Sequence, residues 1–561
     1  MPRANPATES FNTGEVSGRL AARLSFNKYA FAGETMLNML SLIEGGMTRR
    51  PGTRYVSTIG DQTKVPRLLN FVFSTTQAYI VLAEENKFRF FKDQGQITVS
   101  DTDASITNGA FPSGITDWDD KSTGAGSIAH DASNLRLSLV PGGATASDIG
   151  WAEQDVAVGA AYDTNEHVLK FRVIGAPGDK IELRVGTTTT GTELVDDVEF
   201  NVGYHCYPFT PGDGNNTVYI GFRNRGDFRN KTVQIDDVSL VDNTGINLDT
   251  PYTESQLFGI SKAQSADVMY IVHASHPVYK LTRTGHTAWS LIEVAWIDGP
   301  YLPENSSTTT LIPSAATGLG ITLTLSSTAG VNDGQGWIST DIGRLVRYKK
   351  ASAWGYAVIT SITSTTIAVA DVRENFEALP TAQTTFRLGA WSGTTGYPSA
   401  ITFFEQRLFL AGTSTQPQTF WGTQTATQED MTPDDLAGAV EADDALNFSL
   451  ATGEVNVIRW MSSGVRLFIG TVGGEWVVRS AGPVLKPADI DVKQHTTHGS
   501  AAVPHTRVGS VVLFVQAAGR PLAGIRRSEA TARVGGFRRA APDRRRGPRR
   551  WCTQRPRAPR R

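Results

Sequence analysis

Cysteine is almost absent from this chain of 561 residues, which contains only Cys206 and Cys552. Two cysteines are too few for a disulfide framework, and no Cys/His spacing matches a zinc site. No uninterrupted apolar run is long enough to cross a bilayer, and the opening residues MPRANPATES lack the basic and then apolar order of a secretory signal. We therefore expect no membrane span and synthesis in the cytoplasm of the producing cell.

Motifs of the common catalytic sites are also missing. There is no GxSxG, no Walker loop, no HExxH, and no GxGxxG between a strand and a helix. Neighbouring acids occur as Asp119-Asp120, Asp196-Asp197 and Asp236-Asp237, but adjacent side chains on a strand point to opposite faces, so such a pair does not form the facing carboxylates of a glycosidase. We expect a protein that is not an enzyme and requires no cofactor; a glycan hydrolase is the least favoured alternative.

The composition is that of a folded, turn-rich protein. Charged residues make up 19% and apolar residues 40%, with 55 Gly and 26 Pro, which excludes disordered and collagen-like chains. A chain of this length needs several cores, and we expect three or four domains.

Positive charge is concentrated at one end. The segment from Gly519 to Arg561 contains 15 Arg and two acids, a net charge of +13, so the rest of a chain with net charge −2 carries −15. Such a tail could bind nucleic acid, because Arg neutralises phosphates. It contains no Lys and consists mainly of Arg, Pro, Ala and Gly, and we favour the interpretation that a GC-rich gene is read there in the wrong frame.

Alternating apolar residues predict a mainly β protein. Five stretches share one design, an apolar strand, a short polar turn and a second apolar strand; they start at Arg67, Ser261, Ala400, Val457 and Arg507. Hairpins of this kind cannot bury both faces alone, so we expect them to stack as the blades of a propeller-like frame. One short helix is predicted near the N-terminus, where Met36, Leu40 and Ile43 recur three or four residues apart and Gly45-Gly46 ends the pattern.

Uneven spacing of the hairpins predicts inserted domains. The first insertion contains alternating strands that fit a β-sandwich, and the second has enough strands for a small β-barrel. The expected organisation is an N-terminal arm and helix (1–56), a first blade (57–100), a jelly-roll sandwich (101–245), a blade (246–300), a small barrel (301–390), further blades (391–518) and the Arg-rich tail (519–561).

Four motifs, in order, resemble one family of phage proteins. They are FNTGEVSGRLAARLSFNKY with TRRPGTRYV, then AQSADVMYIVHASHPVYKLTR, DGPYLPEN and GYPSAITFFEQRLFLAGTSTQPQTFW. The combination is similar to proteins related to tail tubular protein B, the nozzle of short-tailed phages. The resemblance implies a virion tail protein that forms a hexameric ring below the portal and adaptor, with a channel for genomic DNA and lateral docking of tail fibres. Related chains continue with further strands where this one becomes Arg-rich after Arg520.

On this reading the basic residues near the N-terminus contact a neighbouring subunit. Arg pairs with carboxylate and phosphate alike, but a single basic pair is weak support for a nucleic-acid site. The expected contact residues are Arg19, Arg23, Arg49, Arg50, Pro51 and Gly52. The acidic body suits a DNA conduit, because a negative wall repels phosphates.

The predicted sandwich ends in TVQIDDVSLV, which resembles the last strand of carbohydrate-binding jelly rolls. The resemblance implies that Asp236 could hold a structural calcium, although one Asp makes no site and a solvated strand-end acid is favoured. Trp151, Tyr204 and Tyr207 are candidates for stacking on a host surface glycan, and core packing is the favoured alternative for such rings. A glycan-binding adhesin is therefore the second hypothesis for the whole protein.

Overall fold

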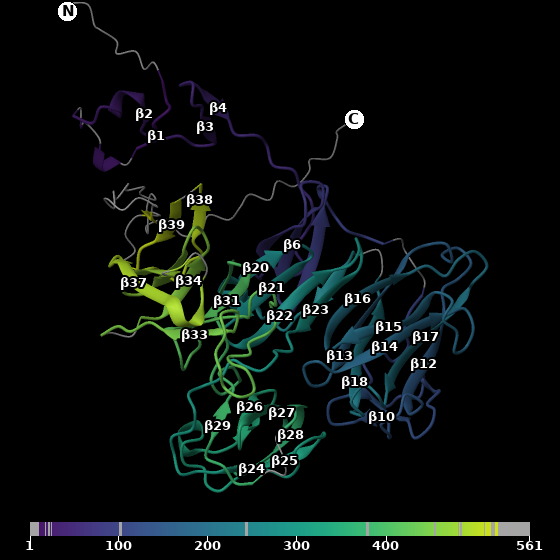
Figure 1. Ribbon diagram of the computed structural model, residues 1–561. Coiled ribbons are helices and arrows are strands. Elements are labelled where there is room, and N and C mark those ends of the chain that lie inside the picture. Colours follow the sequence, from purple (N-terminus) through teal and green to yellow (C-terminus); the bar gives the residue numbers. More distant parts are fainter. Residues whose placement is uncertain are drawn as a thin grey trace, which may run out of the picture. The chain divides into compact units, whose positions relative to one another are not determined.

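The computed structural model (Figure 1) confirms the mainly β class, with 45% strand and 4% helix. It describes residues 10–16, 18–20, 23, 25–99, 104–241, 245–376, 381–453, 456–480, 482, 485–509, 511–517 and 522–525. The Arg-rich tail lies outside these residues apart from the backbone of Leu522–Ile525. The chain divides into two compact units, one made of residues 1–55 and 506–561 and the other of residues 56–505.

The N-terminal part of the first unit contains short strands and two single 3₁₀ turns. These are β1 (Gly14–Glu15), the turns Gly18–Leu20 and Tyr29–Phe31, β2 (Ala32–Gly33), β3 (Met39–Ser41) and β4 (Met47–Arg49). The helix predicted from Met36, Leu40 and Ile43 is wrong, because β3 and β4 form an antiparallel hairpin there. Asn38 has a φ of 57°, a left-handed conformation that interrupts a helix, and short helices need a buried face that this segment lacks.

The C-terminal part of the same unit is a small antiparallel sheet. It contains β38 (Thr506–Val508), β39 (Val511–Val515) and β40 (Leu522–Ile525). Val512 and Phe514 are buried, as expected for one apolar face of a hairpin. The hairpin predicted from Arg507 is therefore present.

The frame of the second unit is a series of antiparallel sheets that stack face to face. The first contains β5 (Arg67–Val72), β6 (Ala78–Glu84), β7 (Lys87–Lys92), β8 (Gly95–Gln96) and β19 (Asn247–Asp249). Three four-stranded meanders follow. The first contains β20 (Ser261–Ser265), β21 (Val268–His273), β22 (His276–Arg283) and β23 (Trp289–Glu293). The second contains β30 (Ala400–Phe404), β31 (Arg407–Ala411), β32 (Thr419–Gly422) and β33 (Leu446–Ser449), and the third contains β34 (Ile458–Ser462), β35 (Leu467–Thr471), β36 (Glu475–Ser480) and β37 (Ile490–Thr496).

Each neighbouring pair of these sheets shares a core, as blades do. Strand β31 is buried throughout, with Leu408 and Leu410 packed toward β20–β23 and Phe409 packed toward β34–β37. In the core between the first sheet and β20–β23, Trp289 stacks on Phe90 at a centroid distance of 4.1 Å. The frame is therefore a stack of antiparallel sheets that share cores face to face.

The first insertion is a two-sheet β-sandwich around one core, in which Phe171 and Phe222 are fully buried. One sheet has the order β15-β14-β17-β12-β9, and the other contains β10, β11, β18, β13 and β16. Strand β16 also pairs with β23, so this sheet continues into the blade β20–β23. The strands are β9 (Asp119–Asp120), β10 (Ser127–Asp131), β11 (Arg136–Val140), β12 (Ile149–Ala157), β13 (His167–Ile174), β14 (Lys180–Gly186), β15 (Val195–Asn201), β16 (Gly203–Phe209), β17 (Thr217–Arg225) and β18 (Val233–Leu240).

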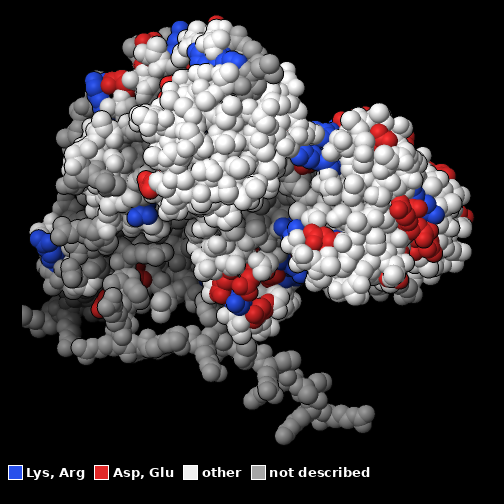
Figure 2. Space-filling view, turned by 90° about the horizontal axis from the view of Figure 1, so that it is seen from below, with Lys and Arg blue, Asp and Glu red and all other residues white. Residues whose placement is uncertain are grey.

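The second insertion is a curled six-stranded sheet with the order β24-β25-β28-β27-β26-β29. An antiparallel bridge between Leu311 and Gln383 joins β24 to the segment before β29, and the sheet forms a half-barrel around Trp337 and Tyr348. Its segment Asn305–Asn332 contains no Lys, Arg, Asp or Glu, and charged side chains are sparse over much of the face seen from below in Figure 2. The strands are β24 (Leu311–Pro313), β25 (Ile321–Leu325), β26 (Leu345–Lys350), β27 (Ala353–Ser364), β28 (Ile367–Glu374) and β29 (Phe386–Leu388).

The remaining helical pieces are short 3₁₀ turns at Glu254–Gly259, Asn332–Gly334, Ser339–Asp341 and Pro487–Asp489. Among the described residues, no helix is long and apolar enough to span a membrane.

Candidate functional site

The hairpin of β3 and β4 carries apolar side chains that its own unit does not bury. Leu37 is 77% exposed, Leu40 is 48% exposed and Ile43 is 93% exposed; we call these three residues the N-terminal apolar surface. Burying a Leu or Ile side chain fully stabilises a protein by roughly 1.5 to 3 kcal/mol. Clustered apolar side chains that stay in water on a folded segment mark a contact surface for another molecule.

The predicted subunit-contact residues lie at the end of the same hairpin. Arg49 is the last residue of β4, and Arg49, Arg50, Pro51 and Gly52 are all exposed. Arg50 is held against the hairpin, because its backbone N–H donates to the Asn38 carbonyl at 2.8 Å and its Nε donates to Asn38 Oδ1 at 3.3 Å. A basic group therefore borders the N-terminal apolar surface.

The two earlier arginines of the predicted contact lie apart in sequence from the hairpin. Arg23 is exposed. Arg19 belongs to the 3₁₀ turn Gly18–Leu20, but its side chain lies outside the described part of the structure.

The first blade of the second unit has an exposed apolar face that sequence reasoning missed. On β5, Leu69 and Phe71 are buried while Leu68 is 67% exposed and Val72 is 49% exposed. Ile80 on β6 pairs with Asn70, which lies between Leu68 and Val72 on β5, and Ile80 is 43% exposed. The sequence does contain a signal for this exposed face. The run RLLNFVF is apolar on both faces of the strand, whereas a half-buried strand alternates apolar and polar residues.

Trp151, the first candidate for a glycan contact, lies among charged groups and is only 6% exposed. It stands on β12 on the face opposite the sandwich core, since its neighbour Ala152 belongs to that core. The guanidinium carbons of Arg184 and Arg223 lie 5.0 and 5.2 Å from its ring centroid. Both arginines are paired with Asp197. The indole face is therefore occupied by cations and is closed to a stacking sugar.

Tyr204 and Tyr207 lie on β16, in the other sheet, and pack on different cores. The Tyr204 ring packs against the core between the first sheet and β20–β23, and the guanidinium carbon of Arg172 lies 4.9 Å from the ring centroid. Tyr207 packs against the sandwich core in an edge contact with Phe200 at 5.2 Å. The structure therefore does not bring the three predicted aromatic residues together on one surface.

Asp236, the predicted calcium ligand, lies in the middle of β18 and has local partners. Its Oδ2 lies 3.8 Å from Arg136 Nε, and its Oδ1 accepts a hydrogen bond from the backbone N–H of Asp237 at 2.9 Å. Burial raises the pKa of this carboxyl, and the Asp237 charge adds to the effect. Within the described ranges, no three His, Cys, Asp or Glu side chains gather in a way that could hold a metal.

No family model matches this chain, and no curated protein matches it.

Proposed function

We propose that this chain is a non-catalytic structural subunit of a homo-oligomeric ring in a bacteriophage tail, where it acts as part of the nozzle. The four motifs that resemble tail tubular protein B suggest the tail, the virion location and a ring of six. The observation that carries the assembly proposal is the N-terminal apolar surface, with Ile43 93% exposed in the hairpin turn and Leu37 77% exposed at the open end, where exposed Arg49 and Arg50 also lie.

A neighbouring copy is the occupant that fits this surface best. Apolar residues that are exposed in a single subunit stabilise a permanent subunit contact when it removes them from water. Basic residues at the border of the contact orient an acidic surface of the neighbouring subunit. The chain outside the Arg-rich tail carries −15, so acidic partners for Arg49 and Arg50 are available on any neighbouring copy.

The same net charge supports passage of DNA. A wall with excess carboxylates repels phosphates, and a wall rich in Lys and Arg would retain them. In the proposed ring the propeller-like frame of each subunit supports the channel, contacts with portal and adaptor lie at one end, and the inserted sandwich and barrel face fibre proteins or a host glycan.

The test is the mass of the full chain in solution. We expect light scattering after size-exclusion chromatography to give a mass of several chains, and negative-stain images to show rings. The double variant Leu40→Asp/Ile43→Asp places two charges in the proposed contact and should give monomers. Val465→Asp is the matched control, because Val465 is 63% exposed in the turn before β35 and should leave the mass unchanged.

A wild-type chain that stays monomeric at concentrations of about 100 µM, well above the Kd of a stable assembly, would contradict the ring. Rings that survive the double variant unchanged would place the subunit contact elsewhere and remove the observation that carries the proposal.

A further inference from the structure

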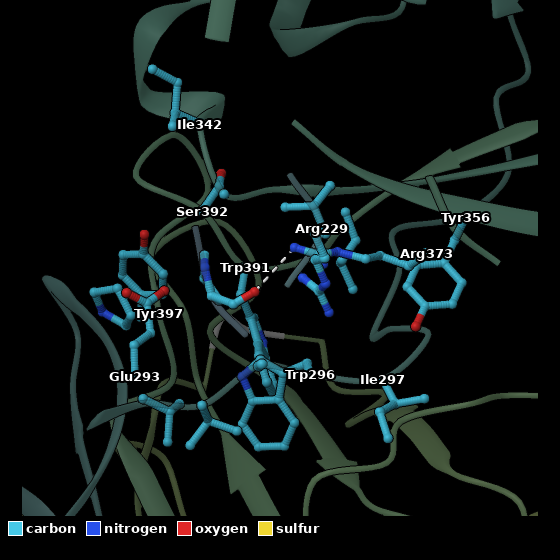
Figure 3. A pocket seen from close by; sticks show the side chains of 18 residues that line it. Arg229, Glu293, Trp296, Ile297, Ile342, Tyr356, Arg373, Trp391, Ser392 and Tyr397 are labelled. Carbon is cyan, nitrogen blue, oxygen red and sulfur yellow. Dashed lines mark hydrogen bonds between the residues drawn. The ribbon is translucent and has the colours of Figure 1, made fainter. Parts of the chain in front are cut away.

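A cavity of about 160 Å³ lies in the second unit where four parts of the chain meet. The sandwich contributes Pro177 and Arg229, and the segment that ends the blade β20–β23 contributes Glu293 and Trp296. The barrel and the loop before β30 complete the wall with residues that include Ile342, Tyr356, Arg373, Trp391, Ser392 and Tyr397. Figure 3 shows the labelled side chains around this space.

One side of the cavity is cationic. Arg373 Nη2 donates to the Pro177 carbonyl at 3.1 Å, but its buried Nη1 has no hydrogen-bond partner among the described residues. Arg229 lies near it in Figure 3, and its Nη1 is 3.5 Å from Asp179 Oδ1, the limit of a hydrogen bond. A buried guanidinium N–H without an acceptor is unfavourable by itself, so this side is suited to receive an anion.

The other side is acidic and hydroxylic. Glu293 is the last residue of β23 and pairs with Tyr279 across the sheet. Its carboxyl lies beside Tyr397 in Figure 3. Ser392 also lines the space. A carboxyl group and hydroxyls can each donate to, or accept from, the hydroxyls of a ligand.

The wall between the two sides is aromatic. Trp296 and Trp391 meet edge to face at a centroid distance of 5.0 Å. Trp391 is 8% exposed, and its indole N–H is buried without a hydrogen-bond partner among the described residues. Indole rings cover the C–H faces of a sugar, and an unpaired indole N–H offers a donor to a further ligand oxygen.

We propose that this cavity binds a single acidic sugar residue, a hexuronic acid. Its carboxylate would face Arg229 and Arg373, its C–H surface would lie on Trp296 and Trp391, and its hydroxyls would meet Glu293 and Tyr397. A neutral sugar leaves the Arg373 Nη1 unpaired, and inorganic phosphate leaves the aromatic and acidic sides unused. The cavity volume is below the 300 to 1,000 Å³ of pockets for drug-sized molecules, which limits the ligand to one ring. This site is separate from Trp151, Tyr204 and Tyr207 and does not depend on ring assembly.

The experiment uses the full chain and two matched probes, methyl β-D-glucuronide and methyl β-D-glucoside, which differ at the carboxylate. Binding is followed by saturation-transfer NMR and by calorimetric titration. We expect the glucuronide to bind at least about tenfold more tightly than the glucoside. Arg373→Gln and Trp296→Leu should each weaken glucuronide binding by about tenfold or more. Arg459→Gln, which removes the same charge from an exposed position on β34, should leave it unchanged.

Three results would overturn the inference: no saturation transfer to the glucuronide at about 10 mM, where even weak sites are occupied; equal binding of the two glycosides; or full competition by equimolar inorganic phosphate. If loss of the Pro177 contact prevents Arg373→Gln from folding, Arg229→Gln tests the same side, since Arg229 is 38% exposed at its side chain. Unchanged binding by Arg229→Gln would then count against the proposal. Failure of the ring assay leaves these results unaffected, because the cavity lies within one chain.

Discussion

Replacing Glu293 with Gln should change how the stability of the protein depends on pH. Burial raises the pKa of the Glu293 carboxyl from its ordinary value of 4.5 to about 7, because the side chain faces the cavity instead of bulk water. Tyr279 and Tyr397 lie beside it, and Arg229 and Arg373 line the far side of the same space. Glu293→Gln keeps the size and hydrogen-bonding capacity of the side chain and removes its titration.

The direction of this pH dependence follows from the number of protons that the folded and unfolded states bind. Between pH 4.5 and 7 the unfolded chain has lost the Glu293 proton while the folded protein keeps it, so rising pH favours unfolding. Each pH unit costs about 1.4 kcal/mol, and the pKa difference corresponds to roughly 3 kcal/mol. Above pH 7 both states are ionised and the penalty stays constant. Glu293→Gln should therefore be about as stable as the wild type near pH 4.5 and more stable by up to roughly 3 kcal/mol at pH 8.

The assay is hydrogen exchange of the β22 and β23 amides in the two proteins at pH 5 and pH 8, corrected for intrinsic exchange rates. Local opening free energies are needed because a chain with several domains does not unfold in one step. Other groups titrate in this range: burial lowers the pKa of His273 to about 4, with a contribution from the His276 charge. Comparing variant and wild type at the same pH cancels such groups. A difference that is the same at pH 5 and pH 8 would refute the assignment of a raised pKa to Glu293.

Three further outcomes follow from individual contacts. Trp289→Ala should destabilise the first two blades by about 3 to 5 kcal/mol, because Trp289 is 1% exposed and stacks on Phe90; hydrogen exchange of the β7 and β23 amides measures this, and a loss below about 1 kcal/mol would contradict the core assignment. Asp434→Ala should cost about 3 to 5 kcal/mol, since it removes one of the two carboxylates, Asp434 at 2.7 Å and Asp298 at 3.0 Å, that hold the fully buried Arg347. Asp435→Ala removes an exposed carboxylate that accepts hydrogen bonds from the backbone N–H groups of Gly438 and Ala439, and it should cost less, about 1 kcal/mol. Chelation with EDTA should leave the melting temperature unchanged, because Asp236 is engaged by Arg136 and the Asp237 N–H; a drop in Tm restored by Ca²⁺ would identify a calcium site there.

Local patterns predicted most of the strands of the frame and none of their long-range partners. The hairpin predicted from Ala400 forms β30 and β31, whose turn residues Glu405 and Gln406 both have positive φ. A polar pair between apolar strands was enough to place that turn, although Gly and Asn are the usual residues for this conformation. The apolar spacing of Met36, Leu40 and Ile43 led to a wrong prediction of a helix. A periodic pattern predicts a helix only where another element can bury the apolar face of that helix.

Contacts between residues far apart in the sequence explain why the candidate site in the structure differs from the residues predicted from the sequence. Trp151 is a credible sugar contact in sequence, but Arg184 and Arg223, 33 and 72 residues further along, close over it from strands β14 and β17. The pairing of β16 with β23 makes the sandwich an extension of the blade, and this brings Arg229 next to the segment after Glu293. The barrel then supplies Arg373 to the same cavity. No window of the sequence contains both the arginine side and the Glu293 side of that cavity, because the residues that line it come together only where the two insertions meet the frame. A sequence can therefore identify the modules of such a protein, whereas binding sites at their junctions need coordinates.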